Sequence, residues 1–253
     1  MYQYIKVRDW IPLEKLDWSW LSGREEAISL LEQNLDKIDW CRLSRNPSAI
    51  HILEQNMDKV NWNELSLNPN AIHILERHLD KVNWYNLSTN PNAIHVLEQN
   101  FDSIDWIDLC WNPNAIHILA NNLDKINWSN LSMSPGAISL LKKYRENICW
   151  ESLSSNKNPD ILPLLEANLD KVLDKRWLCM NPNATPLLKR NLGRVDWTIV
   201  SYNKNGSDLL KDHLDLVDWE VLSMVTNATH LLEENMDKIH WAYLCQNKNA
   251  IHI

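Results

Sequence analysis

The sequence predicts an all-α fold, an α-solenoid of about ten to eleven 22-residue units, each formed by one helix plus one short α or 3₁₀ turn. Two observations predict this fold. Tryptophan recurs every 22 residues from Trp18 to Trp150 and again from Trp197 to Trp241, and between Trp40 and Trp128 an Asn-Pro pair followed by apolar residues at helical spacing separates successive tryptophans. The tryptophans of this ladder are Trp18, Trp40, Trp62, Trp84, Trp106, Trp128, Trp150, Trp197, Trp219 and Trp241.

The longer element of each repeat is predicted from the segment "NPNAIHILE", which begins at Asn68 and recurs 22 residues later with one Ile→Val change. Asn68 is expected to cap a helix, and Pro69 suits the first helical position because no amide partner is needed there. The apolar residues that follow lie on one face. We expect an amphipathic helix of about three turns that ends near His78 or Leu79.

The shorter element carries the tryptophan. Asn or Asp precedes the tryptophan in eight repeats and is expected to cap this element. Only about five residues separate that cap from the next Asn-Pro pair, which leaves room for a single turn. The caps are Asp17, Asp39, Asn61, Asn83, Asp105, Asn127, Asp196 and Asp218. We expect the tryptophans to lie in the core, because one large residue per repeat beside a cap is typical of a packing position.

The repeat pattern also predicts the domain organisation. Residues 1–16 are expected to form an N-terminal cap over the stack, and residues 17–253 a single repeat solenoid with an irregularity at 156–177. Ser22 and Glu25 match a capping box that would open the first helix. Within the irregular segment Asp174 falls at the tryptophan position, and Trp177 is the candidate to fill the same space.

Charge and hydropathy exclude several partners. The net charge is −8, and the Lys and Arg residues are spread along the chain, whereas a nucleic-acid surface needs them clustered. No apolar run is long enough for a signal peptide or a membrane span. We therefore expect a cytoplasmic protein with neither a nucleic acid nor a membrane as its partner.

No residues of the chain form a recognisable catalytic or metal site. The five cysteines include no C-x-x-C pair and are expected to be small buried residues in a reducing compartment. Successive histidines of a second ladder would lie too far apart to share a metal, so we expect them to pack or to hydrogen-bond. These are His51, His73, His95 and His117. The carboxylates follow the repeat as well, which predicts no enzyme activity and no cofactor.

The segments "NPNAIHILE", "LDKINW" and "LS" resemble the short tandem repeats of proteins from giant nucleocytoplasmic DNA viruses, the mimivirus-like and algal-virus groups. The resemblance covers nearly the whole chain. It implies a viral origin and, with it, a location in the host cytoplasm, the viral factory or the virion. It implies no activity and no site residues.

We expect a non-enzymatic scaffold that binds a protein, host or viral, along a curved surface, the ordinary use of solenoids. Five residues just before the Asn-Pro caps are the candidate binding stripe, because they are apolar where a loop should be polar: Leu67, Trp111, Met133, Tyr202 and Met224. That these side chains tuck between neighbouring turns is an equally open interpretation. The alternative function is a structural virion or viral-factory component that self-associates through its open C-terminal repeat.

Overall fold

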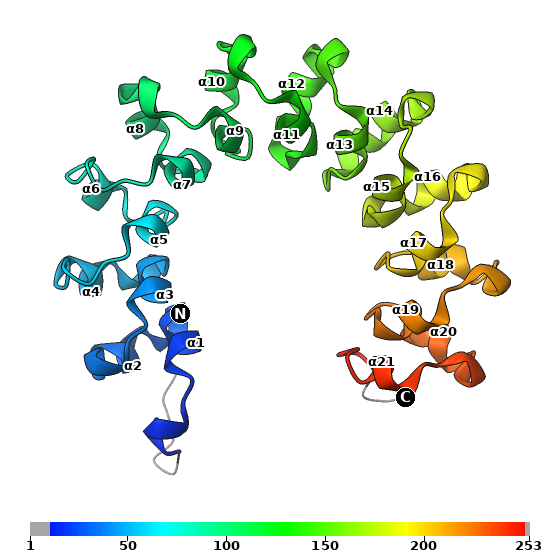
Figure 1. Cartoon of the computed structure of the whole chain (residues 1–253), viewed down its shortest axis with the longest axis horizontal. Coiled ribbons are helices and arrows are strands. Elements are labelled where there is room, and N and C mark those ends of the chain that lie inside the picture. Colours follow the sequence, from blue (N-terminus) through cyan, green and yellow to red (C-terminus); the bar gives the residue numbers. More distant parts are fainter. Residues whose placement is uncertain (1–10, 251–253) are drawn as a thin grey trace. The chain divides into compact units, whose positions relative to one another are not determined.

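The computed structural model describes residues 11–250, which contain helices and no strand. The chain divides into two compact units, Met1–Ile126 and Asn127–Ile253, which we call the first half and the second half and describe separately. Within each half, short helices alternate between two rows (Figure 1). The predicted α-solenoid is confirmed. The expected N-terminal cap falls largely on residues 1–10, which lie outside the described residues.

The first row contains the helices that begin at the ladder position, and we call them the ladder helices. In the first half they are α1 (Trp18–Ser22), α3 (Trp40–Ser44), α5 (Trp62–Ser66), α7 (Trp84–Thr89) and α9 (Trp106–Leu109). In the second half they are α11 (Trp128–Met133), α13 (Trp150–Ser154), α15 (Lys175–Met180), α17 (Trp197–Ser201), α19 (Trp219–Met224) and α21 (Trp241–Leu244). All eight predicted caps accept a hydrogen bond from a backbone N–H of the first turn, as expected.

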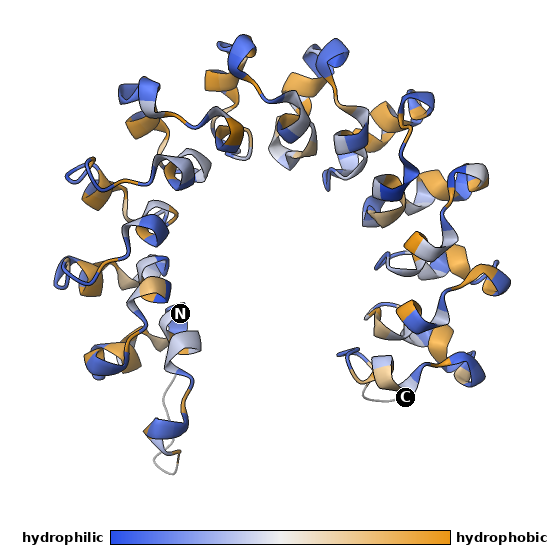
Figure 2. Cartoon of the chain, in the orientation of Figure 1, coloured by the Kyte–Doolittle hydropathy of each residue, from blue (hydrophilic) through white to orange (hydrophobic). Residues whose placement is uncertain are grey.

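The second row contains the helices of the Asn-Pro segments. In the first half they are α2 (Ile28–Glu32), α4 (Ile50–Glu54), α6 (Ile72–Leu75), α8 (Ile94–Gln99) and α10 (Ile116–Ala120). In the second half they are α12 (Ile138–Lys143), α14 (Leu162–Glu166), α16 (Thr185–Arg190), α18 (Ser207–Leu210) and α20 (Thr229–Glu233). Figure 2 shows that hydrophobic residues are concentrated in this row, whereas the ladder helices have a mixed composition.

Two kinds of 3₁₀ turn flank the second row. One kind leads into it: η2 (Glu25–Ala27), η4 (Pro47–Ala49), η7 (Pro135–Ala137), η9 (Pro159–Ile161) and η11 (Pro182–Ala184). The other follows it: η3 (Leu35–Lys37), η5 (Phe101–Ser103), η6 (Leu123–Lys125), η8 (Arg145–Asn147), η10 (Leu169–Lys171), η12 (Leu192–Arg194), η13 (Leu214–Leu216) and η14 (Met236–Lys238). One further turn, η1 (Leu13–Lys15), precedes α1.

The second-row element is shorter than the sequence suggested. Together η4 and α4 make about two turns instead of three. A side chain ends the helix, because the Asn56 amide donates to the carbonyl of Ile52 at 2.8 Å and the chain then turns into the next segment. Asn34, Asn100 and Asn122 end their helices in the same way.

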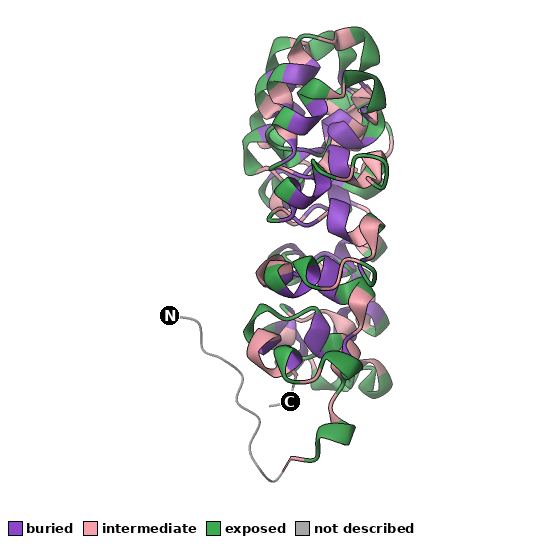
Figure 3. Cartoon of the chain, turned by 90° about the vertical axis from the view of Figure 1, so that its left-hand side faces the viewer, coloured by how far each residue is buried: buried purple, intermediate pink, exposed green. Residues whose placement is uncertain are grey.

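The core is made of leucine and alanine, so the prediction of a tryptophan core is wrong. Leu43, Leu53 and Ala49 are fully buried, as are their equivalents in nearly every other repeat, while no ladder tryptophan is buried. The buried residues run through the interior of the stack in Figure 3. At Gly206, which holds the alanine position of its repeat, a Cβ would lie 2.5 Å from the carbonyl oxygen of Val200, so that repeat has no room for alanine. In the irregular segment the fully buried Ile161 ends η9 at the corresponding place.

The ladder tryptophans instead lie half-buried along an edge of the stack, except Trp241, which is 55% exposed. Each begins a helix, so one face of its ring is available to the lysine of the next repeat. Lys59 lies 4.9 Å from the ring centroid of Trp40, and Lys81 lies 4.9 Å from that of Trp62. Such cation–π contacts contribute about 0.5–1 kcal/mol each at exposed sites. The tryptophans therefore cover the edge of the core, and four of them, Trp40, Trp62, Trp106 and Trp150, have a lysine over the ring.

A buried row of asparagines joins successive repeats. The Asn68 amide donates to the carbonyls of Ser44 and Asn46 in the preceding repeat, at 3.0 Å each, and its Oδ1 accepts from the N–H of Asn70. Asn68 therefore caps the turn at residues 69–70, whereas α6 begins only at Ile72 and has no side-chain cap, so the predicted helix cap is wrong in this repeat; the same side chain also satisfies two buried carbonyls. We call this the asparagine ladder. Its members are Asn46, Asn68, Asn90, Asn112, Asn156, Asn181, Asn203 and Asn247.

A parallel row of serines makes a second connection. Ser22 donates to the carbonyl of Trp18 at 2.7 Å and accepts from the N–H of Asp39 at 3.0 Å. The expected capping box between Ser22 and Glu25 is therefore wrong: Glu25 begins η2, which has no side-chain cap. Ser22 is fully buried and holds the next repeat instead.

The irregular segment keeps the fold with a shifted register. Asp174 is the cap of α15 and Lys175 takes the tryptophan position. Trp177 does not fill that space, because it lies two residues further along the helix and is 46% exposed. The residue inserted before the cap is Leu173, whose side chain is 82% exposed, while Val172 keeps the buried position. The insertion is thus placed outside the core.

Candidate functional site

One surface of the ladder helices varies from repeat to repeat. It consists of the residues one, two and five positions after the ladder residue, for example Tyr85, Asn86 and Thr89 after Trp84. The third and fourth positions hold a buried Leu and a buried Ser in most repeats. The three variable positions are mostly exposed or half-buried, and no residue type recurs through them. We call this surface the variable face.

In the first half, the variable face presents several large exposed side chains. Tyr85 is 58% exposed, Ile107 51%, Trp20 46% and Trp111 39%. Single exposed apolar residues are ordinary, but three of these lie on the neighbouring helices α7 and α9 or directly after them. Aromatic residues gathered in this way are typical of protein-binding surfaces.

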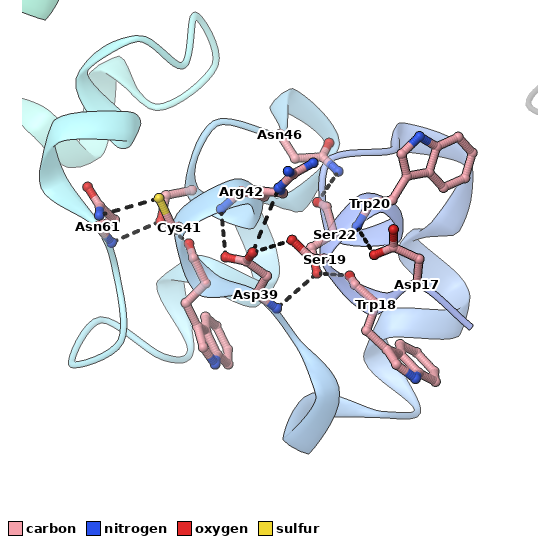
Figure 4. Close-up of polar contacts among 12 residues, drawn as sticks. Asp17, Trp18, Ser19, Trp20, Ser22, Asp39, Cys41, Arg42, Asn46 and Asn61 are labelled. Carbon is pink, nitrogen blue, oxygen red and sulfur yellow. Dashed lines mark hydrogen bonds and ion pairs between the residues drawn. The ribbon is translucent and has the colours of Figure 1, made fainter. Parts of the chain in front are cut away.

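Polar contacts organise the variable face at the start of the chain (Figure 4). The Ser19 hydroxyl donates to the Asp39 carboxylate at 2.6 Å, and Asp39 also caps α3 through the N–H of Arg42. The bond from Ser19 is the main reason that the pKa of Asp39 lies below its ordinary value. Next to it, a cleft of about 410 Å³ opens beside Gly23 and is lined by Cys41, Arg42, Arg45, Asn46 and Glu64.

The predicted stripe is part of the variable face, at its fifth position. Trp111 is 39% and Tyr202 51% exposed, while Leu67, Met133 and Met224 are half-buried. In the first half the stripe residues are Leu67 and Trp111, two repeats apart, and the other three lie in the second half. None of the five is buried, but their role in binding stays a prediction.

The sequence analysis missed Met180, Tyr85 and Trp177 on this surface. Met180 holds the fifth position of α15 and is 50% exposed, but the inserted residues hide its register. Tyr85 and Trp177 occupy the first and second positions, which vary as much as the fifth. That variation was the signal available in the sequence.

One residue of the variable face, Asp108, carries a carboxyl group in a buried position, where a negative charge is unfavourable. Asp108, two positions after Trp106, is 8% exposed, and its Oδ2 has no hydrogen-bond partner. Burial raises the pKa of Asp108, with a further contribution from the charge of Asp105, while a hydrogen bond from the Tyr85 hydroxyl opposes the shift.

The histidine ladder hydrogen-bonds, as expected. His73 Nε2 lies 3.0 Å from Glu54 Oε1, and His51, His95 and His117 pair in the same way with the glutamate of the preceding repeat. These pairs lie on the exposed side of the second row. Within residues 11–250, no three His, Cys, Asp or Glu side chains are grouped so that they could hold a metal ion.

The cysteines differ partly from expectation. Cys110 and Cys179 are buried, and Cys149 is half-buried, but Cys41 and Cys245 are exposed. Cys41 lies at a variable position, where a small residue is not enclosed, and it accepts a hydrogen bond from the Asn61 amide at 3.6 Å. Cys245 follows α21, in the last described repeat.

Comparison with known proteins finds no similarity: no family model, no curated protein and no solved structure matches the chain. The resemblance to giant-virus repeats therefore stays a prediction. No helix between residues 11 and 250 is long and apolar enough to cross a membrane.

Proposed function

We propose that the chain is a non-enzymatic scaffold that binds a protein partner along the variable face. One observation carries the proposal: in the first half, residue identity varies on the exposed face of the ladder helices, whereas the exposed side of the second row repeats His and Glu. Exposure alone therefore does not account for the variation of the ladder-helix face. Binding specificity is the ordinary use of such variation.

The side chains on this face support the same proposal. Large exposed residues such as Tyr85, Trp177, Met180 and Tyr202 offer contact area that is concentrated on one side of the ladder helices. By contrast, the exposed side of the second row carries His–Glu pairs and glutamine, which repeat through the first half. Aromatic and methionine side chains dominate the energetics of protein interfaces more than such residues do.

The test compares two matched variants in pull-downs from infected-cell lysate, with the retained proteins identified by mass spectrometry. One variant replaces Trp111, Met133 and Tyr202 with Ser on the variable face. The control replaces Gln55, Gln99 and Glu234 with Ser on the exposed side of the second row. We expect a protein that the wild-type chain and the control retain and the variable-face variant loses, with all three chains giving the same circular dichroism spectrum.

A partner that all three chains retain equally would remove the variable face from the binding surface. Retention of the chain itself or of capsid proteins alone, together with a mass that rises with concentration in light scattering, would favour the structural, self-associating alternative. Identification of the retained protein as viral or host would also test the expected viral origin.

A further inference from the structure

Asp108 holds a variable position, and the fold does not require an aspartate there. The equivalent residue in the preceding repeat is Asn86, whose amide donates to the carbonyl of Asn63 at 2.8 Å. An ionised carboxylate is the same size but has no hydrogen to donate. In agreement with this, Oδ2 of Asp108 is buried without a partner. Asparagine would suit this position better than aspartate.

A buried carboxylate without a full set of partners weakens a folded protein. Burial and the neighbouring charge of Asp105 both favour the protonated form of Asp108, which is the sign of such an unfavourable environment. Residues that lower stability in this way are found where the group serves binding. The missing partner of Oδ2 is a hydrogen-bond donor, and the best donor for a carboxylate carries a positive charge.

The surroundings of Asp108 suit a cation as well. The Tyr85 hydroxyl lies near enough to Asp108 to lower the pKa of that carboxyl, and the Tyr85 side chain is 58% exposed, so it is free to move aside. Trp111 follows α9, its backbone N–H donates to the carbonyl of Asp108 at 2.9 Å, and its side chain is 39% exposed. Aromatic faces attract Arg and Lys through their π electrons. Moreover, residues 1–126 contain 18 Asp and Glu against 11 Lys and Arg, a formal charge of −7.

We propose that Asp108, Tyr85 and Trp111 form a binding site for a cationic side chain, Arg or Lys, of the protein partner. This inference rests on the proposed scaffold function and names the chemistry of what the scaffold binds. The incoming guanidinium or ammonium group donates to Oδ2 of Asp108 and packs against the two aromatic rings, and Tyr85 moves aside to admit it. The negative first half draws the basic partner toward this face.

The site is tested with a small probe, without the partner. The full-length chain, labelled with ¹⁵N, is titrated with N-acetyl-arginine methylamide and, separately, with the citrulline analogue, which has nearly the same shape but no charge. The indole N–H signal of Trp111, assigned from the Trp111→Phe variant, reports binding. We expect a saturable shift with the arginine compound and none with the citrulline compound.

Two substitutions complete the test. Asp108→Asn should weaken arginine binding at least about tenfold, because it removes the charge that pairs with the probe, and it should raise the melting temperature, because it supplies the missing amide donor. Asp102→Asn removes the same charge from an exposed position of the same half and should change neither quantity. Absence of a saturable shift, or equal binding by the Asp108→Asn variant, would overturn the proposal. A fall in the melting temperature of that variant would do so too, since the carboxylate would then be needed by the fold.

The outcome is distinguishable from failure of the scaffold proposal. If arginine does not bind but a protein is still captured through the variable face, only the cation site is rejected. If arginine binds at Asp108 and no captured protein depends on the variable face, the site stands and the scaffold function is rejected.

Discussion

Replacement of Asn90 by alanine tests how far the asparagine ladder holds the repeats together. Asn90 is 1% exposed, and its amide donates to the carbonyls of Ser66 and Asn68, at 3.0 and 3.1 Å, while its Oδ1 accepts from the N–H of Asn92 at 3.0 Å. Alanine removes three hydrogen bonds and leaves buried polar groups without these partners. At about 1 kcal/mol for each bond, and more for each group left unsatisfied, the expected loss is about 3–5 kcal/mol.

The variant should still fold and be measurable. Ser134 and Val225 already replace the ladder asparagine in two repeats, so the stack tolerates an interruption. Because each repeat contacts only its neighbours, the loss should appear as early opening around residues 66–92 and not as uniform weakening. Urea unfolding followed by circular dichroism gives the free energy, and amide hydrogen exchange locates the opening.

Two further variants sharpen this measurement. Asn92→Ala removes one exposed bond, from the Asn92 amide to the carbonyl of Pro69 at 2.9 Å, and should lose no more than about 1 kcal/mol. Asn90→Asp keeps the acceptor for Asn92 but directs a charge at two carbonyls, so at pH 7 it should be at least as damaging as alanine. If Asn90→Ala were no worse than Asn92→Ala, the ladder would not be what joins the repeats.

Three other predictions concern single side chains. Because the pKa of Asp108 is raised, its ionised form weakens the fold above that pKa. The stability gained by Asp108→Asn should be greatest near pH 7, shrink as the pH falls from the raised pKa toward the ordinary value of 3.8, and change little below it; melting curves from pH 3 to pH 7 measure this. The lowered pKa of Asp39 gives the opposite dependence of stability on pH, because here the ionised form stabilises the fold. Ser19→Ala should lower stability by about 1 kcal/mol at pH 7, and the loss should fade in acid as Asp39 becomes protonated in both proteins. Ser66→Ala, which breaks bonds to Trp62 and Asn83, should lower stability by about 1–2 kcal/mol in urea unfolding, whereas Ser66→Cys should be milder because Cys110 and Cys179 hold the same position naturally.

The period of the sequence was enough to predict the fold, because a 22-residue spacing with an Asn-Pro helix start admits few other arrangements. The caps before the tryptophans were predictable for the same reason: Asp or Asn in front of a short apolar segment has a local role that the neighbouring residues define. A side-chain hydrogen bond can be predicted from the sequence when its partner lies within a few residues.

The failures share one physical cause. We expected the tryptophans in the core because they are large. Whether a residue is buried depends, however, on how far its position lies from the surface of the stack, and the tryptophans lie at the edge. Asn68 was expected to cap a helix, but its two bonds to Ser44 and Asn46 cross to another repeat and could not be read from the local pattern. Likewise, Asp108 is in the sequence one of many different residues at a variable position, and its buried and unpartnered oxygen is visible only in the structure.

The asparagine ladder gives the stack a polarity. The amide of each ladder asparagine points back to the carbonyls of the repeat before it, as Asn68 does to Ser44 and Asn46, and Asn70 donates back to Pro47 in the same sense. During synthesis, which proceeds from the N-terminus, every new repeat would thus bring the donors for acceptors that are already in place. A growing stack of this kind exposes carbonyl oxygens at its advancing end, and in most repeats the asparagine of the next repeat donates to them.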